Sequence, residues 1–273
     1  SPAFRTPTGV AVNPTGTRAY IANRGGASVS VVDIATNSVV ATINVGNDPD
    51  WVTVNPAGTR AYVTNSSDDT VSVIDLGANA VTATISVGNQ PNGVAVNPSG
   101  TRAYVPNGQE VSVIDTATNA VIDTIDIGYW ASGIAATESY AYATVSYNGA
   151  KVVVIDSSTN AVTATISVGP DYLRGIAVDP NGTRAYVVDG FKNLSVINTT
   201  TNTVAATYDL GNGTSLGLTV DPTGNQLYIT GSQDYNSGYE VLVFDTVSNT
   251  VTATIALNLP GGNQEGNIAA SST

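Results

Sequence analysis

The chain has 273 residues and a formal net charge of −12, with 11% charged residues and with no cysteine or histidine. Without these two residue types it can form no disulfide bond, no thiolate or imidazole metal site and no catalytic triad that relies on either residue. The acidic balance argues against a nucleic-acid partner, because phosphate binding requires clustered lysine and arginine. The sequence predicts no metal site and no cofactor.

A unit of roughly 42 residues recurs along nearly the whole chain, and such a period is typical of solenoids and propellers. Its clearest copy runs from Pro91 to Gly128. Because a repeat of this kind buries its faces only against its neighbours, residues 1–273 are predicted to form a single domain. The predicted units cover residues 7–46, 49–88, 91–128, 130–169, 172–211 and 215–257, followed by a closing tail at 258–273.

Each unit contains four short strand patterns separated by turns rich in Gly, Pro and Asn. In the clearest copy these patterns cover residues 93–96, 102–105, 111–115 and 120–127. Short alternating runs of β-branched and aromatic residues indicate strands, and no unit shows the 3.6-residue period of an amphipathic helix. Four antiparallel strands per repeat predict an all-β fold, a six-bladed β-propeller, with a seven-bladed arrangement as the alternative.

The tail contains a short echo of the innermost strand. Residues 266–270 read Gly-Asn-Ile-Ala-Ala and resemble Gly-Ile-Ala-Ala at 133–136. We expect this segment to be an extra inner strand that helps to close the ring, or else the beginning of an incomplete blade.

The second unit carries a recognisable motif. Residues 61–65 read Ala-Tyr-Val-Thr-Asn, preceded by Pro-x-Gly-Thr-Arg and followed by Val-Ser-Val-Ile-Asp. This pattern resembles the YVTN-repeat β-propellers of archaeal surface-layer proteins and exported bacterial proteins, and the resemblance covers essentially the whole chain. It implies a cell-surface or binding module without a shared catalytic set. Propeller lactonases and the virginiamycin B lyase type look similar at the level of the repeat, but their sites rely on histidine, which this chain lacks.

Composition also bears on location and assembly. Few lysines, many Thr and Asn residues, and no Cys or Met fit an extracellular or cell-surface protein. No apolar run approaches the ~20 residues needed to span a bilayer, so no transmembrane segment is expected. We expect a monomer.

The up-and-down strand order places the connections on two faces. The "turn face" holds the turns between first and second and between third and fourth strands, which repeat Pro-x-Gly-Thr-Arg and Asp-x-x-x-Asn. These turns are predicted to be structural, with Asp and Asn binding their own backbone. Arginines at this face are expected to pair with the strand-ending aspartates, Arg18 with Asp33, Arg60 with Asp75, and Arg102 with Asp115. A tyrosine at one repeated strand position is predicted to be buried in every unit: Tyr20, Tyr62, Tyr104, Tyr142, Tyr186 and Tyr228.

The "variable face" holds the loops between second and third strands and between units, and these differ from unit to unit. Variable, aromatic-rich loops on a rigid scaffold are typical of a binding surface. Loops between units enter the innermost strands and so lie nearest the channel. The predicted ligand-binding residues are Asp50, Trp51, Asn92, Tyr129, Trp130, Tyr172 and Arg174, and the face also carries Arg24, Tyr147, Phe191, Tyr235 and Tyr239. The alternative is that Trp51 and Trp130 only fill gaps between blades.

Three functions follow from this pattern. The first is binding of a carbohydrate or a cell-surface macromolecule, because aromatic rings beside Asn and Asp suit sugars. The second is a hydrolase or lyase, with carboxylates from Asp48, Asp50, Asp171 and Glu265 and with Arg174 or a tyrosine at the channel mouth. No spacing singles out a carboxylate pair, so catalytic residues are unknown. The third is a structural cell-wall or surface-layer module.

Overall fold

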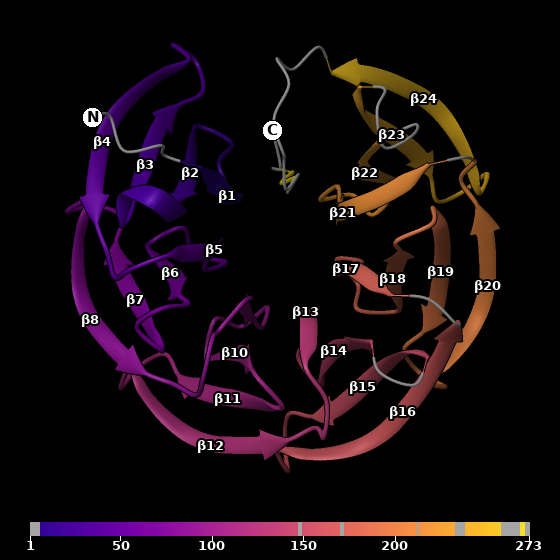
Figure 1. Cartoon of the computed structure of the whole chain (residues 1–273), viewed down its shortest axis with the longest axis horizontal. Coiled ribbons are helices and arrows are strands. Elements are labelled where there is room, and N and C mark those ends of the chain that lie inside the picture. The colour runs from indigo at the N-terminus through magenta and orange to yellow at the C-terminus, as the bar shows by residue number, and fades with distance from the viewer. Residues whose placement is uncertain are drawn as a thin grey trace.

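The computed structural model describes residues 6–146, 149–169, 172–211, 213–232, 238–257 and 268–270. Six four-stranded antiparallel sheets form a ring, which confirms the predicted six-bladed β-propeller (Figure 1). Strand order within each sheet follows chain order, from the channel outward. Within these ranges no helix is long and apolar enough to cross a membrane.

The strands of successive blades are six to nine residues long, except β9, which has two. Blades one to three comprise β1 (Pro7–Val12), β2 (Arg18–Asn23), β3 (Ser28–Asp33) and β4 (Ser38–Asn44); β5 (Pro49–Val54), β6 (Arg60–Asn65), β7 (Thr70–Asp75) and β8 (Ala80–Ser86); and β9 (Ala95–Val96), β10 (Arg102–Asn107), β11 (Glu110–Asp115) and β12 (Ala120–Asp126). Blades four to six comprise β13 (Ala131–Ala136), β14 (Tyr140–Ser146), β15 (Ala150–Asp156) and β16 (Ala161–Gly169); β17 (Leu173–Val178), β18 (Arg184–Asp189), β19 (Asn193–Asn198) and β20 (Thr203–Asp209); and β21 (Thr214–Val220), β22 (Gln226–Ser232), β23 (Tyr239–Asp245) and β24 (Thr250–Leu257). A 3-10 turn, η1 (Arg24–Gly26), follows β2.

The turn face is built by side chains that accept hydrogen bonds from their own turn. Asn13 Oδ1 accepts the backbone N–H groups of Thr17 and Arg18 at 2.9 and 3.0 Å. Asp115 Oδ1 accepts the backbone N–H and the hydroxyl of Thr118 at 2.8 and 2.9 Å. These bonds stabilise the ionised carboxylate and hold the pKa of Asp115 below its ordinary value. The structural interpretation of the repeated turns agrees with these contacts.

Acid is expected to destabilise the propeller through these turns. Bonds from their own turns also lower the pKa values of Asp33, Asp156 and Asp245. A group with a lower pKa in the folded state contributes stability above its unfolded pKa of about 3.9 and loses it as the pH falls through the folded value. We expect the melting temperature to be level above about pH 5 and to fall towards pH 2, as measured by circular dichroism.

Blade five supplies the matched control for the acid experiment. Asn198 stands in place of the strand-ending aspartate and accepts the N–H groups of Thr200 and Thr201 at 2.9 and 3.1 Å without titrating. Replacing Asp115 and Asp156 by Asn should therefore keep the turns and flatten the acid dependence. If the melting temperature of that variant fell between about pH 5 and pH 2 as steeply as that of the original chain, the turn aspartates would not be the cause of the acid sensitivity.

Arg60 and Arg102 of the turn face bind the next blade, so their expected ion pairs with Asp75 and Asp115 were wrong. Among the described residues Arg18 shows no such contact, and its charge contributes to the lowered pKa of Asp33. Arg60 is the register partner of Asp75, yet its Nη1 donates to the carbonyl of Thr116 in blade three at 2.6 Å. Arg102 Nη1 likewise donates to the carbonyl of Ser157 and to Asn160 Oδ1 in blade four. The aspartates already accept bonds from their own turns, whereas the carbonyls of the next blade lie within the reach of a long guanidinium.

Buried side chains form one apolar cluster at each of five boundaries between consecutive blades, among the residues that the structure describes. At the boundary between blades two and three, Tyr62, Val73 and Ile85 pack against Ala103 and Val105 of the next blade. The repeated tyrosine is buried in blades one to five, as predicted. The prediction was wrong for blade six, where Tyr228 is half-buried and its hydroxyl bonds Gln226 Oε1 of its own strand at 2.8 Å.

Candidate functional site

One position in each innermost segment lies where the chain enters the blade from the variable face. This "rim position" is the residue before Gly9, Trp51, Gly93, Gly133, Gly175 or Gly217, and it is occupied by Thr8, Asp50, Asn92, Ser132, Arg174 and Leu216. In blades one, two, four, five and six the strand register shifts here. A β-bulge re-aims the side chain it carries, so the bulges turn this position towards the channel mouth.

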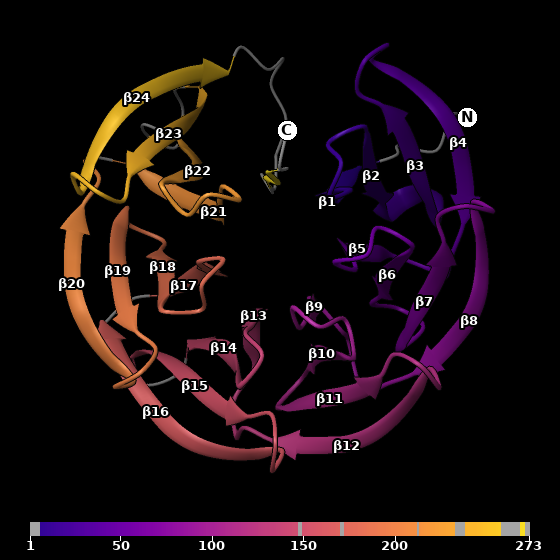
Figure 2. The same cartoon turned by 180° about the vertical axis from the view of Figure 1, so that it is seen from behind.

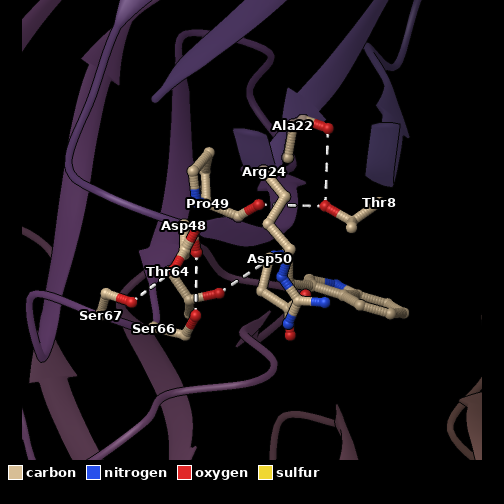
Figure 3. Close-up of polar contacts among 10 residues, drawn as sticks. Thr8, Ala22, Arg24, Asp48, Pro49, Asp50, Thr64, Ser66 and Ser67 are labelled. Atoms are coloured by element: carbon tan, nitrogen blue, oxygen red, sulfur yellow. Dashed lines mark hydrogen bonds and ion pairs between the residues drawn. The ribbon is translucent and has the colours of Figure 1, made fainter. Parts of the chain in front are cut away.

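Three rim residues connect one blade to the next. Thr8 Oγ1 donates to the carbonyl of Pro49 at 3.0 Å (Figure 3). Asn92 Nδ2 donates to the carbonyl of Ala131 at 2.6 Å, and Ser132 Oγ to that of Leu173 at 3.1 Å. A hydroxyl or an amide at the rim thus serves the scaffold. Asn92, predicted as a ligand-binding residue, has this structural contact as well.

The other two polar rim residues are charged and depart from that pattern. Asp50 is an acceptor only, and its Oδ1 lies 3.2 Å from Arg24 Nη2, with the two side chains 19% and 39% exposed (Figure 3). Arg174 is exposed. An ion pair at this exposure is worth little to stability, so its groups can exchange partners at small cost.

A polar hollow of about 670 Å³ lies on the variable face beside this ion pair. Its lining includes three of the predicted residues, Asp50, Asn92 and Trp130, together with Arg24 from blade one. The loops after β6 and β8 complete it with Ser66, Ser67, Asp69, Asn89 and Gln90. The volume is in the range of small-ligand sites, and the donors and acceptors converge from three blades.

Loop carboxylates around the hollow are used to hold the loops in place. Asp68 accepts the backbone N–H and the Nδ2 of Asn47 at 2.7 and 2.9 Å, which lowers the pKa of Asp68. Asp69 Oδ1 accepts the N–H of Gln90 at 2.8 Å, and Asp48 accepts the hydroxyl of Ser67 (Figure 3). These hydrogen bonds join the loops around the hollow to one another, so the three carboxylates have a structural role.

The predicted aromatic residues divide into exposed and structural ones. Trp130 and Tyr172 are 52% and 67% exposed, and Trp130 lines the hollow. Tyr129 is half-buried against the cluster between blades three and four, with Lys151 Nζ 5.3 Å from its ring centroid. A ring that is packed on one side and stacked on a cation on the other serves the scaffold.

Trp51 takes a place that is glycine in every other blade. A Cβ on Gly9 would lie 2.8 Å from the Trp51 Cα, so the innermost strands of blades one and two touch here. Trp51 is half-buried beside the cluster between blades two and three, and its backbone N–H donates to Thr64 Oγ1 at 3.1 Å. Together with Asn92 and Arg174 it lines a small axial cavity of about 40 Å³. That cavity has room for water but not for a sugar ring.

Hollows of similar size also occur on the turn face, so size alone does not single out a site. One of about 630 Å³ is lined by Thr137, Glu138 and Asp179. Glu138 accepts the N–H and hydroxyl of Ser99, and Asp179 accepts those of Thr183. Polar groups that already bind the turns of their own or the preceding blade offer less to a ligand than the exposed Trp130 and the Asp50–Arg24 pair.

The predicted site residues lie in two separate places in the structure. The structure brings Asp50, Asn92 and Trp130 to the hollow, and Trp51, Asn92 and Arg174 to the axial cavity. Tyr129 and Tyr172 line neither of these two. Ser66, Ser67 and Gln90 were not singled out, because their role depends on which loops lie together. The predicted Tyr147, Asp171, Tyr235 and Glu265 lie outside the described residues.

No protein-family model matches the chain. A segment of 47 residues is 49% identical to the PE-PGRS family protein PE_PGRS18 of Mycobacterium tuberculosis. This segment is 17% of this chain and 10% of that protein. Among solved structures, Kuenenia stuttgartiensis hydrazine synthase is similar with a TM-score of 0.81 and 23% sequence identity, over 92% of this chain and 87% of that chain. This likeness shows the fold alone.

Proposed function

We propose that this propeller is an exported or cell-surface binding module that takes a carbohydrate in the polar hollow of its variable face. The observation that carries the proposal is the 52% exposed indole of Trp130 on the wall of a hollow that also holds the Asp50–Arg24 pair. An exposed indole is costly to maintain and is typical of recognition surfaces.

Sugars match both kinds of group in the hollow. The apolar face of a pyranose ring packs on an aromatic plane, and its hydroxyl groups donate to carboxylates and accept from guanidinium and amide groups. The Asp50 carboxylate supplies hydrogen-bond acceptors, and the Arg24 guanidinium, 3.2 Å away, supplies donors. Asn92 adds an amide to the same hollow. The few polar groups fix orientation while the ring supplies contact area.

Location at the cell surface rests on composition and on the resemblance to YVTN-repeat propellers. The chain has no cysteine or methionine to oxidise and few lysines, and its −12 charge suits a soluble exposed particle. A surface polysaccharide is a ligand that such a module would meet.

The test is a titration of the full chain with neutral and uronic-acid oligosaccharides, followed by tryptophan fluorescence. We expect a saturable change in emission and no new product. Trp130→Ala should weaken binding about tenfold or more, because it removes the stacking surface.

Two matched variants separate the site from its surroundings. Phe191→Ala removes an aromatic side chain that is 55% exposed on the same face but does not line the hollow, so affinity should be unchanged. Asp50→Asn should weaken binding without unfolding the protein. Equal effects of Trp130→Ala and Phe191→Ala would refute the site. Product formation would favour the hydrolase or lyase alternative. No change in tryptophan emission with any oligosaccharide would favour the structural module.

A further inference from the structure

The ring of blades has one boundary unlike the others. Each of the five boundaries from blade one to blade six is filled by an apolar cluster, and innermost strands such as β1 and β5 or β17 and β21 pack together. Between blade six and blade one, the described residues form no such cluster. Figures 1 and 2 show β21–β24 and β1–β4 as the two ends of the row of blades, with no described sheet between them, and this boundary is called the opening below.

Blade six presents an apolar face to this opening. Tyr228 is half-buried, whereas Tyr62 at the same position is fully buried. Ile255 in β24 is 49% exposed, whereas its equivalent Ile85 in β8 is 5% exposed. These side chains hold the positions that fill the seam in other blades.

Blade one presents the complementary face. Ala19, Ile21 and Val32 are all partly exposed, although their counterparts Ala61, Val63 and Ile74 in blade two are fully buried. Ile34 is 38% exposed. The two sides of the opening are therefore the two halves of ordinary seams, each without its partner.

The channel side of the opening already holds a short segment, residues 268–270. Ile268 lines the axial cavity together with Val94, Ile134, Ile176 and Leu218, which each follow the glycine next to the rim position in four innermost segments. Residues 268–270 read Ile-Ala-Ala, the same letters as Ile-Ala-Ala at 134–136 of blade four. Residue 268 thus occupies the place of an innermost-strand residue.

We propose that the opening between blades six and one is a docking site for a three-stranded antiparallel sheet of the repeat type, which completes a seventh blade around residues 268–270. The occupant follows from the five filled seams. Four of them place Tyr, Val and Ile of one blade against Ala, Val and Ile of the next, and the fifth, between blades five and six, places Tyr, Val and Leu against Leu, Ile and Phe. The opening offers both halves of this apolar pattern. A sheet with the second-to-fourth strand sequence of the repeat supplies both missing halves.

The test uses the full chain extended by one such sheet. Residues 271–273 are replaced by a second copy of residues 97–128, so that the added turn follows Ala270 as Asn97 follows Val96. Burial of two apolar seams should raise the melting temperature by on the order of 10 °C. The amides of β1–β3 and β22–β24 should exchange hydrogen at least tenfold more slowly, because these strands no longer border an open seam.

Two controls make the outcome decisive. The same extension with Val105→Asp and Ile114→Asp in the added copy should give no rise, because charges then replace the seam residues. Val32→Asp in the host should change the melting temperature little in the original chain but cancel the rise in the extended one. Equal melting of the extended and charged-extension proteins would overturn the proposal. So would a dimer of the original chain that Val32→Asp converts to a monomer, because a second copy would then fill the opening.

Discussion

Glu240→Gln is expected to lower the free energy of unfolding by about 3–5 kcal/mol. Lys192 Nζ contacts Glu240 Oε1 across the boundary between blades five and six, and the two side chains are only 3% and 4% exposed. Removing the carboxylate leaves the ammonium buried without its counter-charge. Urea unfolding followed by circular dichroism measures the effect.

The double variant Lys192→Met with Glu240→Met tests this reasoning. Two unbranched apolar side chains fill similar space without charges to desolvate, so stability should return to near that of the natural chain. Asp50→Asn is the matched exposed control, because the Asp50–Arg24 pair is partly open to water and should cost about 1 kcal/mol or less. Similar losses for Glu240→Gln and Asp50→Asn would show that burial does not govern the strength of the pair.

The blades could be predicted because their information is local and repeated. A turn such as Asn13 to Arg18 is fixed by an Asn side chain that binds backbone groups four and five residues away. The same motif recurs at Asn55, which accepts both bonds, and at Asn97, whose Oδ1 accepts the N–H of Arg102 at 2.9 Å. A turn whose hydrogen bonds join residues close in the sequence can be predicted from that sequence.

Contacts between blades could not be read in this way. Lys192 and Glu240 are 48 residues apart, and neither lies in a repeated motif. Arg60 was expected to pair with Asp75 within its blade, but its guanidinium reaches Thr116 of the next one. Which partner wins depends on the distance between sheets, and that distance is set by residues at the close approaches of the innermost strands, such as Gly9 against Trp51.

The candidate site was predictable as a face and less so as a set of residues. Variation among loops located the variable face, and three predicted residues do share one hollow. Tyr129 and Trp130 are adjacent in sequence, yet one packs under Lys151 and the other is 52% exposed. The chain bends at Gly128 and Tyr129 between two strands, and the directions of side chains in such a bend are not given by the sequence pattern, which assigned both residues the same role.

The repeated tyrosine shows how an identical motif residue acquires a different energetic role from its place in the ring. Tyr62→Ala is expected to lower the free energy of unfolding by about 3–5 kcal/mol, because it opens a cavity in a filled seam. Tyr228→Ala should cost about 1 kcal/mol, because its ring is only half-buried and the site can be filled by water. Urea unfolding of both variants in the full chain measures the difference.

The contrast between the two tyrosine variants depends on the opening beside blade six. In the extended protein with an added sheet, Tyr228 would face the second strand of a seventh blade, as Tyr62 faces Ala103 and Val105. The cost of Tyr228→Ala should then rise to that of Tyr62→Ala. Equal costs in the original chain would mean that Tyr228 is already packed in solution, which would contradict an open seam. The position of a blade in the ring, and not its motif, then decides what each tyrosine contributes.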